Sequence, residues 1–229
     1  MRWYEFLHQF IWRIIGELGG GKKIIPLSLA VNTHKGLTAL LVIGLMVIYN
    51  NFSLPAWIYL GLHGSYGVCW IIKHLAFRDR RWDQPVTIGG ALFAWIFLAT
   101  YWIGPWLLIS GQSSWETPLW LLSLAIFIYG IGLVLMIGAD SQKHFTLAHQ
   151  PGLITTGLYR RIRHPNYLGE MLVYSSFAMT TGHWMPWVVL FVWWSIFFIP
   201  NMLMIEKSIS RHPGWPEYKK QSGFIIPKL

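Results

Sequence analysis

The chain has 229 residues, of which 54% are hydrophobic and 17% aromatic, while only 12% carry a charge. Its mean hydropathy of +0.44 is too high for a soluble globular domain, so the composition indicates an integral membrane protein in a lipid bilayer. The single cysteine, Cys69, excludes an intramolecular disulfide and a cysteine-based metal site, and the net charge of +9 is spread over loops, which argues against nucleic-acid binding.

The first 35 residues predict a segment that lies on the membrane surface. Apolar side chains recur at helical spacing between Trp3 and Ile14, and the polar side chains from Arg2 to Arg13 fall on the other face. This pattern is typical of an amphipathic helix in the membrane interface.

The remainder of the chain contains windows of about 20 mostly apolar residues, which is the length that a helix needs to cross a bilayer. The sequence therefore predicts an all-α, polytopic transmembrane helical bundle with about six spans behind the N-terminal interfacial amphipathic helix. The predicted spans are Gly36–Phe52, Leu54–Leu75, Ile88–Ile109, Pro118–Gly138, Tyr167–Thr181 and Trp184–Ile205.

These spans form a single predicted integral membrane domain, residues 1–229. Residues 1–35 are its interfacial N-terminal segment, residues 36–138 are its first four spans, and residues 139–229 form a C-terminal part with the candidate cofactor site. A turn at Gly182-His183 makes the last two spans a helical hairpin.

The positive charges predict the orientation of the bundle. All Lys and Arg residues fall within 2–35, 73–81, 143–163 and 207–228, which are alternate loops between the spans. By the positive-inside rule, both termini and the loop before the fifth span face the cytoplasm. The compact size suits a bacterial inner membrane, and the sequence leaves the oligomeric state open.

Polar residues interrupt the apolar pattern first in the second span. His63, Tyr66, Trp70 and Lys73 are spaced by three or four residues, so they lie along one stripe of the helix. This stripe is either a polar seam between helices or one wall of a site.

A second polar group follows the fourth span. Asp140, Gln142 and Lys143 place a carboxylate, an amide and an amine within about one helical turn. Two late residues, Glu206 and Tyr218, belong to the polar tail of the chain.

The most polar stretch beside an apolar helix leads into the fifth span. It contributes Arg160, Arg163, His164, Asn166, Tyr167 and Glu170. Glu170 lies about a turn inside the span, where an unpaired charge costs at least about 2.5 to 3.5 kcal/mol, so it requires a partner. Because a helix N-terminus presents free N–H groups, this region can hold the anionic or amide parts of a cofactor. The residues thus indicate a polar site that opens to the cytoplasm, with an apolar cavity behind it.

From Asp140 onward the chain resembles the membrane superfamily that joins steroid 5-alpha-reductases, sterol reductases and isoprenylcysteine or phospholipid methyltransferases. The resemblance is carried by Arg163-His164-Pro165-Asn166-Tyr167 followed by Gly169, and by the tail with Tyr218 and Pro227. Methyltransferase members generally have Ser or Met after the proline and an apolar or aromatic residue after the glycine. Asn166 and Glu170 are closer to the reductase members.

The reductase resemblance implies an NADPH-dependent enzyme that reduces a carbon–carbon double bond in a lipid or steroid-like, lipophilic small molecule. It implies that the cofactor is bound by Asp140, Gln142, Lys143, Arg160, Arg163, His164, Asn166, Tyr167, Glu170, Glu206 and Tyr218. Tyr66 is the candidate proton donor, with His63 beside it. The reductases pair such a tyrosine with an acid on an early helix, but no Asp or Glu occurs here between Leu18 and Asp79.

Two other functions fit the same sequence. An S-adenosylmethionine-dependent methyltransferase of a membrane thiol, carboxylate or lipid headgroup would use the same scaffold, although a sulfonium donor favours carboxylates and aromatic rings over Lys and Arg. A non-enzymatic lipid-binding module would leave Asp140, Asn166 and Glu170 without a role. No metal site is predicted.

Overall fold

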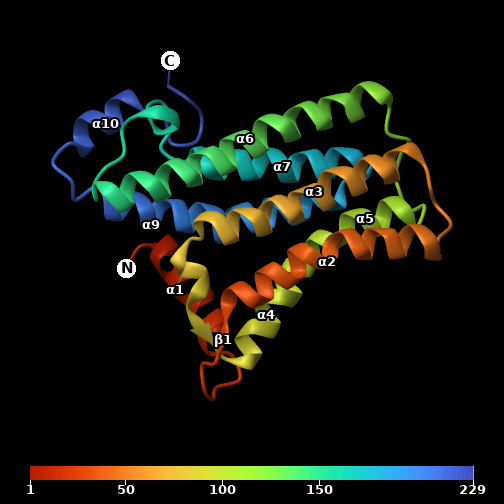
Figure 1. The fold of residues 1–229 in the computed structure, drawn as a ribbon, viewed down its shortest axis with the longest axis horizontal. Coiled ribbons are helices and arrows are strands. Elements are labelled where there is room, and N and C mark those ends of the chain that lie inside the picture. The colour runs from red at the N-terminus through yellow and green to blue at the C-terminus, as the bar shows by residue number, and fades with distance from the viewer. Residues whose placement is uncertain (229) are drawn as a thin grey trace.

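Each apolar window of the sequence folds into a helix, because backbone N–H and C=O groups in hydrocarbon have to be hydrogen-bonded within their own segment. The computed structural model describes residues 1–228, in which these helices run side by side along the long axis of the molecule (Figure 1). Four single helices are α2 (Leu27–Ile48), α3 (Leu54–Phe77), α6 (Leu119–His149) and α7 (Pro165–Thr180). The predicted all-α membrane bundle is confirmed.

Two further spans are composite helices. The third span consists of α4 (Ile88–Ala99), the 3-10 turn η2 (Thr100–Trp102) and α5 (Ile103–Ile109). The sixth consists of α8 (Met185–Trp193), a π-helical turn η4 (Trp194–Phe198) and α9 (Ile199–Ile209). Gly182, with a φ of 60°, forms the expected turn between α7 and α8.

Four of the six spans are long and apolar enough to cross a membrane on their own: α2, α4–α5, α6 and α8–α9. The other two are α3, which carries a polar stripe, and α7, whose 16 residues extend only about 24 Å. Both nevertheless pack inside the bundle with their polar side chains turned toward other helices. Both of these spans carry polar groups of the site, Lys73 on α3 and Asn166 and Glu170 on α7.

The chain before α2 covers one side of the bundle. Helix α1 (Trp3–Glu17) buries Ile11 and Ile15 against the bundle and leaves Trp3, Phe6 and Phe10 exposed. The short strands β1 (Ile25–Pro26) and β2 (Pro85–Val86) pair antiparallel and join the chain before α2 to the chain before α4. Helix α1 thus has one apolar face for the protein and a second for lipid, as an interfacial helix requires.

The first span begins earlier than the sequence predicted. Helix α2 starts at Leu27 rather than Gly36, so residues 27–35 belong to the bundle and not to the interfacial segment. Lys35, the last residue of the predicted interfacial segment, therefore lies inside the bundle and is only 3% exposed. A lysine is accepted there because neighbouring helices supply partners for its amine, and a sequence window cannot show those partners.

Two close helix contacts set the geometry of the bundle. A Cβ on Gly132 of α6 would lie 2.7 Å from the Gly169 carbonyl oxygen and 2.9 Å from Leu172 Cβ, so α6 and α7 touch backbone to backbone. A Cβ on Gly67 of α3 would overlap the Lys35 carbonyl of α2. Small residues permit such approach in membranes, and the second contact brings Lys35 against the polar stripe of α3.

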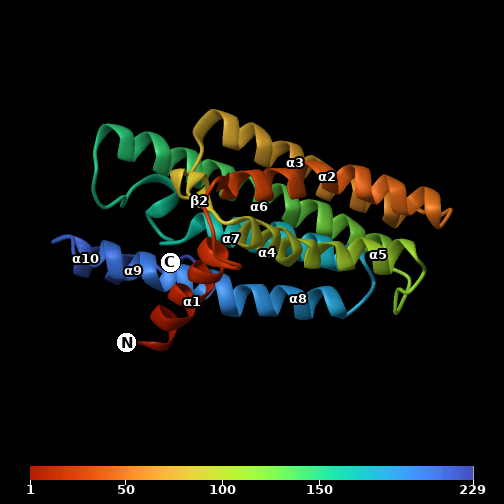
Figure 2. The ribbon, with the colours of Figure 1, turned by 90° about the horizontal axis from the view of Figure 1, so that it is seen from below.

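One end of the bundle carries the N-terminus, the loops 78–87 and 150–164, and the C-terminal residues (Figures 1 and 2). We call it the basic end. The 31 residues of α6 extend about 46 Å, beyond the roughly 30 Å of hydrocarbon, so its last turns project from the membrane at this end. The turns η1 (Arg80–Asp83) and η3 (Gly157–Tyr159) and helix α10 (Trp215–Gln221) lie there too.

Candidate active site

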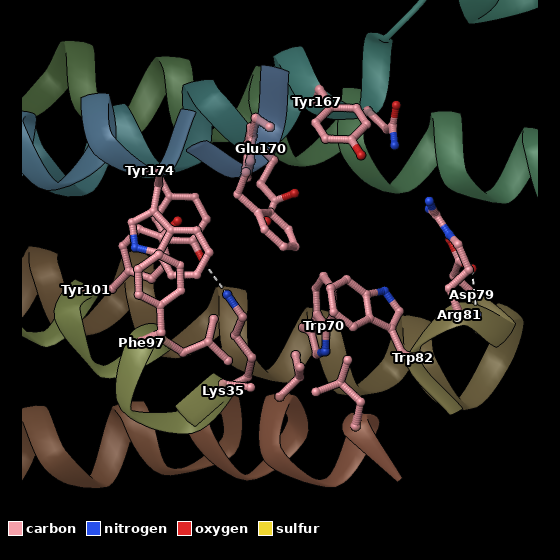
Figure 3. A pocket seen from close by; sticks show the side chains of 18 of the residues that line it. Lys35, Trp70, Asp79, Arg81, Trp82, Phe97, Tyr101, Tyr167, Glu170 and Tyr174 are labelled. Atoms are coloured by element: carbon pink, nitrogen blue, oxygen red, sulfur yellow. Dashed lines mark hydrogen bonds and ion pairs between the residues drawn. The ribbon is translucent and has the colours of Figure 1, made fainter. Parts of the chain in front are cut away.

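A cavity lies between α2, α3, α4, α7 and the π-helical turn η4, and we call it the inner cavity. A water-sized molecule can reach about 110 Å³ of it, and about 10–15 Å³ of such volume holds one water. Figure 3 shows Lys35, Tyr101 and Tyr174 at one end, Glu170 in the middle, and Asp79 and Arg81 at the other end. The cavity therefore joins an aromatic end to a charged end.

The aromatic end is built around the amine of Lys35. Its Nζ donates to the hydroxyl groups of Tyr174 and, at 3.4 Å, Tyr66. It also lies 4.4 Å from the ring centre of Tyr66, 4.9 Å from that of Tyr174 and 5.4 Å from that of Trp70. Aromatic faces and phenol oxygens thus replace the water that this amine loses on burial.

Glu170 provides the nearby acid. Its Oε1 accepts a hydrogen bond of 3.3 Å from the Tyr66 hydroxyl, which therefore bridges Glu170 and Lys35. The acid that the first two spans lack in the sequence is supplied by α7. Tyr66 itself is fully buried and lies outside the residues that line the inner cavity. Of the two phenols that contact Lys35 Nζ, Tyr174 is the one that lines the inner cavity.

A stack of rings forms one wall of the aromatic end. The ring centre of Tyr101 lies 4.1 Å from that of Tyr174, with an angle of 24° between the ring planes. It lies 4.8 Å from the ring centre of Trp193, with an angle of 19°. Phe97 extends the stack, 4.0 Å from Trp193. The π-helical turn contributes Phe197 to the lining. This wall suits a flat or extended apolar group.

The charged end is formed by α3, α6, α7 and the loop after α3, which meet at the basic end. Lys73 of α3 forms an ion pair with Asp140 of α6, whose other oxygen accepts from Asn166 Nδ2 of α7 at 3.1 Å. In the loop after α3, Arg81 pairs with Asp79 at 2.6 Å. Burial opposes ionisation of Asp79, but the hydrogen bonds and charge of Arg81 outweigh it and hold the pKa of this carboxyl well below its usual value.

A second cleft adjoins the charged end, and we call it the outer cleft. It holds about 370 Å³ and shares Lys73, Asp79 and Asp140 with the inner cavity. The other charged lining residues are Arg78, Arg80 and Lys143, so four cationic side chains face two carboxylates. The Lys73–Asp140 ion pair therefore stands between a cationic surface cleft and an aromatic interior.

The structure brings together five of the residues that the sequence singled out as a cofactor site. Asp140, Asn166, Tyr167 and Glu170 line the inner cavity, and Lys143 lines the outer cleft, where its Nζ lies 3.7 Å from Asp79. These five come from α6 and α7, the closest helix pair of the bundle. For them the hypothesis of a shared site stands.

Three of the other predicted residues have roles elsewhere. Gln142 donates to the Thr156 carbonyl at 2.8 Å and accepts from the Leu158 N–H at 3.0 Å, so it fixes the turn η3. Tyr218 donates to the Tyr159 carbonyl at 2.7 Å. Arg160 is exposed on the loop surface and lines neither the inner cavity nor the outer cleft. Gln142 and Tyr218 do not line the inner cavity, because backbone groups of the loop bind their side chains.

Arg163, His164 and Glu206 form a separate ionic cluster that holds the C-terminal tail. Arg163 Nε binds Glu206 Oε1 at 2.7 Å, its Nη1 donates to the Ser222 carbonyl, and His164 Nε2 lies 3.3 Å from the same glutamate oxygen. Arg163 is thus satisfied by the protein and does not line the inner cavity. Arg163 therefore holds the C-terminal tail, in place of the cofactor-binding role that was predicted for it.

We expect Arg163→Met to destabilise the protein by about 3–5 kcal/mol, because it leaves the carboxylate of Glu206 buried without its main partner. The measurement is the unfolding transition of the purified protein in detergent. Arg160→Met, which removes an exposed guanidinium three residues earlier, is the matched control and should leave the transition unchanged. A normal transition for Arg163→Met combined with weaker cofactor binding would return Arg163 to the cofactor site.

His63 is also placed differently from the prediction. It is 1% exposed, its Nδ1 lies 3.0 Å from the Tyr59 hydroxyl, and its ring stacks on Phe177 at 4.2 Å. It does not line the inner cavity. His63 precedes Tyr66 by about one turn of α3, so it lies farther from the basic end.

The residues of the site that sequence reasoning missed include Lys35, Asp79, Arg81, Tyr101 and Tyr174. The signal for Lys35 was the apolar run that begins at Ile24, ahead of the predicted start of the first span. The two tyrosines carried no signal, since an aromatic residue in an apolar span is ordinary. Arg81 carried no separate signal, because it is one of several cations in the basic loop of residues 73–81.

Comparison with known proteins identifies the family without naming an activity. The match to the family described as "protein of unknown function (DUF1295)" covers residues 69–222, which include α3 in part and all elements from α4 to α10. An uncharacterised protein of Schizosaccharomyces pombe is 27% identical over 115 residues, which is 49% of this chain and 41% of the yeast protein. The chain is therefore an integral membrane protein of the DUF1295 family.

Proposed function

We propose that this protein is an NADPH-dependent reductase of a conjugated carbon–carbon double bond in a lipid-like substrate. The observation that carries the proposal is the position of the Lys35–Tyr174 pair at the aromatic end of a cavity whose other end meets a cationic cleft. A proton donor and a cationic surface suited to phosphate thus line two adjoining spaces, which share Lys73, Asp79 and Asp140. That is the arrangement that hydride transfer from a soluble nucleotide to a buried lipid requires.

The residues of the outer cleft fit the charge of the coenzyme. NADPH is a polyanion, and Arg78, Arg80 and Lys143 would hold its phosphates at the membrane surface. Asn166 offers both a donor and an acceptor for the carboxamide of the nicotinamide, and Asp140 offers oxygens for ribose hydroxyls. When bound, the coenzyme supplies a hydride; the chain's own residues supply the remaining chemistry.

Reduction of a double bond by hydride requires an electron sink, which is normally a conjugated carbonyl held by a hydrogen-bond donor. Lys35 and Tyr174 both offer donors at the aromatic end of the cavity. Tyr174 faces the cavity and can deliver a proton, while Lys35 stabilises the resulting phenolate. Glu170, linked to Lys35 through Tyr66, balances the charge of the amine.

The lining of the cavity supports a lipophilic substrate. Val31, Leu27, Phe97 and Leu98 complete an apolar surface around the stacked rings. This apolar lining suits a substrate that partitions into the bilayer. The size of the reachable space favours insertion of the reactive end of the lipid, with the rest of its chain outside.

Methyl transfer from S-adenosylmethionine is the second candidate, because Asp79, Asp140 and Glu170 line the inner cavity together with aromatic rings. Such a setting can favour a sulfonium cation. In this cavity, however, the aromatic rings already surround the amine of Lys35, and Lys73 and Arg81 pair with the two aspartates. A sulfonium cation would therefore find the aromatic rings already in contact with the Lys35 amine and the two aspartates already paired with cations.

The decisive experiment compares binding of NADPH and S-adenosylmethionine to the purified protein in detergent. We expect saturable NADPH binding that Lys143→Met weakens about 10-fold, because a charge-assisted contact with phosphate contributes on the order of 1.4 kcal/mol. Lys220→Met, which removes an exposed cation of α10, is the matched control and should leave the affinity unchanged. Saturable binding of the sulfonium donor without an NADPH response would overturn the proposed function.

A further inference from the structure

We propose that Lys35 is a covalent site for carbonyl compounds, at which its amine condenses with an α,β-unsaturated aldehyde or ketone to form an iminium. The substrate class rests on the proposed function. Formation of the adduct does not, because it requires a carbonyl compound alone. The inference assigns Lys35 a chemical role that a mere hydrogen-bond donor would not have.

The two lysines that line the inner cavity, Lys35 and Lys73, have different surroundings. Lys73 forms a direct ion pair with Asp140, so a carboxylate is already the partner of its amine. The polar contacts of Lys35 in residues 1–228 are two phenol hydroxyls, and neither is a carboxylate. A lysine desolvated in an apolar pocket is the kind that reacts with carbonyl carbon. Of the two amines, only that of Lys35 has such surroundings.

Glu170 can accept a proton from the Lys35 amine through one intervening hydroxyl, that of Tyr66. The Tyr66 hydroxyl lies 3.4 Å from Lys35 Nζ and 3.3 Å from Glu170 Oε1. A proton can therefore pass from the ammonium through Tyr66 to Glu170, which leaves a neutral amine with its electron pair free for attack. Glu170 thereby combines the roles of base and, afterwards, counter-ion to the iminium.

The step balances without an added reagent. The amine nitrogen forms a bond to the carbonyl carbon, and one proton moves from this nitrogen to the oxygen. Glu170 then returns its proton to the same oxygen, and the carbon–oxygen bond breaks to release water. The sum is ammonium plus carbonyl giving protonated iminium plus water. The positive charge stays at the nitrogen, among the same ring faces that surround the amine before reaction.

The adduct makes the substrate a better hydride acceptor. A conjugated iminium accepts a hydride at its β-carbon, and the displaced electron pair moves to nitrogen to give an enamine. A proton from the Tyr174 hydroxyl then adds to the α-carbon, and the phenol is reprotonated from solvent. Hydrolysis of the saturated iminium consumes one water and restores Lys35 and the carbonyl. The stack of Tyr101, Tyr174 and Trp193 suits the flat conjugated group.

The test is to trap the adduct on the full-length protein in detergent, with no coenzyme present. Hexadecanal serves as the probe, because a saturated aldehyde cannot undergo conjugate addition, and sodium cyanoborohydride reduces the iminium to a stable amine. Peptide mass spectrometry then locates the label. We expect Lys35 to be labelled about 10-fold more than the exposed Lys220, as suits a desolvated amine. Equal or weaker labelling at Lys35 would overturn the inference.

Lys35→Arg provides the second measurement, because it keeps the positive charge and the hydrogen-bond donors but cannot condense. We expect it to slow NADPH oxidation with an unsaturated lipid aldehyde by about 100-fold or more while NADPH affinity and the unfolding transition persist. Turnover close to the native rate would show that Lys35 acts through charge alone. Labelling of Lys35 without any NADPH oxidation by the native protein would instead sink the proposed function and leave the covalent site standing.

Discussion

Replacement of Tyr174 by Phe is expected to lower the turnover number by about 100-fold or more, the usual loss when a positioned proton donor is removed. The hydroxyl is the only part of the side chain that changes, so the ring stack with Tyr101 persists. Since Tyr174 lies at the aromatic end, away from the outer cleft, the affinity for NADPH should remain unchanged. Steady-state oxidation of NADPH with an unsaturated lipid carbonyl and a separate binding titration measure the two quantities.

Tyr101→Phe is the matched control for this experiment. Tyr101 lines the same cavity and stacks face to face on Tyr174, but its hydroxyl makes no contact with Lys35 Nζ of the kind that Tyr174 makes. We therefore expect turnover within about 3-fold of the native rate, the effect of a removed hydroxyl that transfers no proton. Equal losses in the two variants would mean that the stack needs both hydroxyls for its shape and would remove Tyr174 as a proton donor.

Replacement of Glu170 by Gln is expected to destabilise the protein by about 1–3 kcal/mol, because it removes the negative charge nearest to the buried amine of Lys35 while preserving the size of the side chain. The Tyr66 hydroxyl that joins the two residues keeps an acceptor in the amide oxygen. The loss is therefore electrostatic in origin. The unfolding transition in detergent measures it.

A double-mutant cycle separates this electrostatic loss from general damage. In a Lys35→Met background, Glu170→Gln should cost less or nothing, which corresponds to a coupling energy of about 0.5–3 kcal/mol between the two sites. The control cycle combines Lys35→Met with Glu206→Gln, whose partner is Arg163 and which shares no contact with Lys35. Those two changes should be additive within about 0.5 kcal/mol. Additivity in both cycles would show that the charge of Glu170 does not offset the charge of Lys35.

Hydropathy located the membrane-spanning helices because that property belongs to each segment alone. The third span was predicted at Ile88–Ile109 and is observed with the same limits as α4, η2 and α5, and the turn at Gly182 separates α7 from α8 as expected. Helix α2 begins nine residues before the predicted start at Gly36, because hydropathy places the charged Lys35 outside a span. A hydropathy window ends a predicted span at a charged residue. In the folded protein, a span can include a charged residue where neighbouring helices supply partners for it.

The candidate site was predictable where its residues are neighbours in the sequence. Asp140 and Lys143 share one end of α6, and Asn166 and Glu170 open α7, so two helical ends already indicated a common polar region. The hydrogen bond from Asn166 to Asp140 shows that these ends meet. The role of Arg163 could not be seen in the same way, since its partner Glu206 lies on α9 and shares no local pattern with it.

By itself, the sequence determined that this is an all-α membrane protein, where most of its helices lie, and that basic residues gather at one end, because length, hydropathy and charge act segment by segment. The tertiary structure decided which polar groups meet. Lys35 and Tyr174 are 139 residues apart and touch only because Gly67 lets α3 approach α2 and Gly132 lets α7 lie against α6. Contacts of that kind depend on how helices pack, and periodicity within one helix carries no information about the side chains on another.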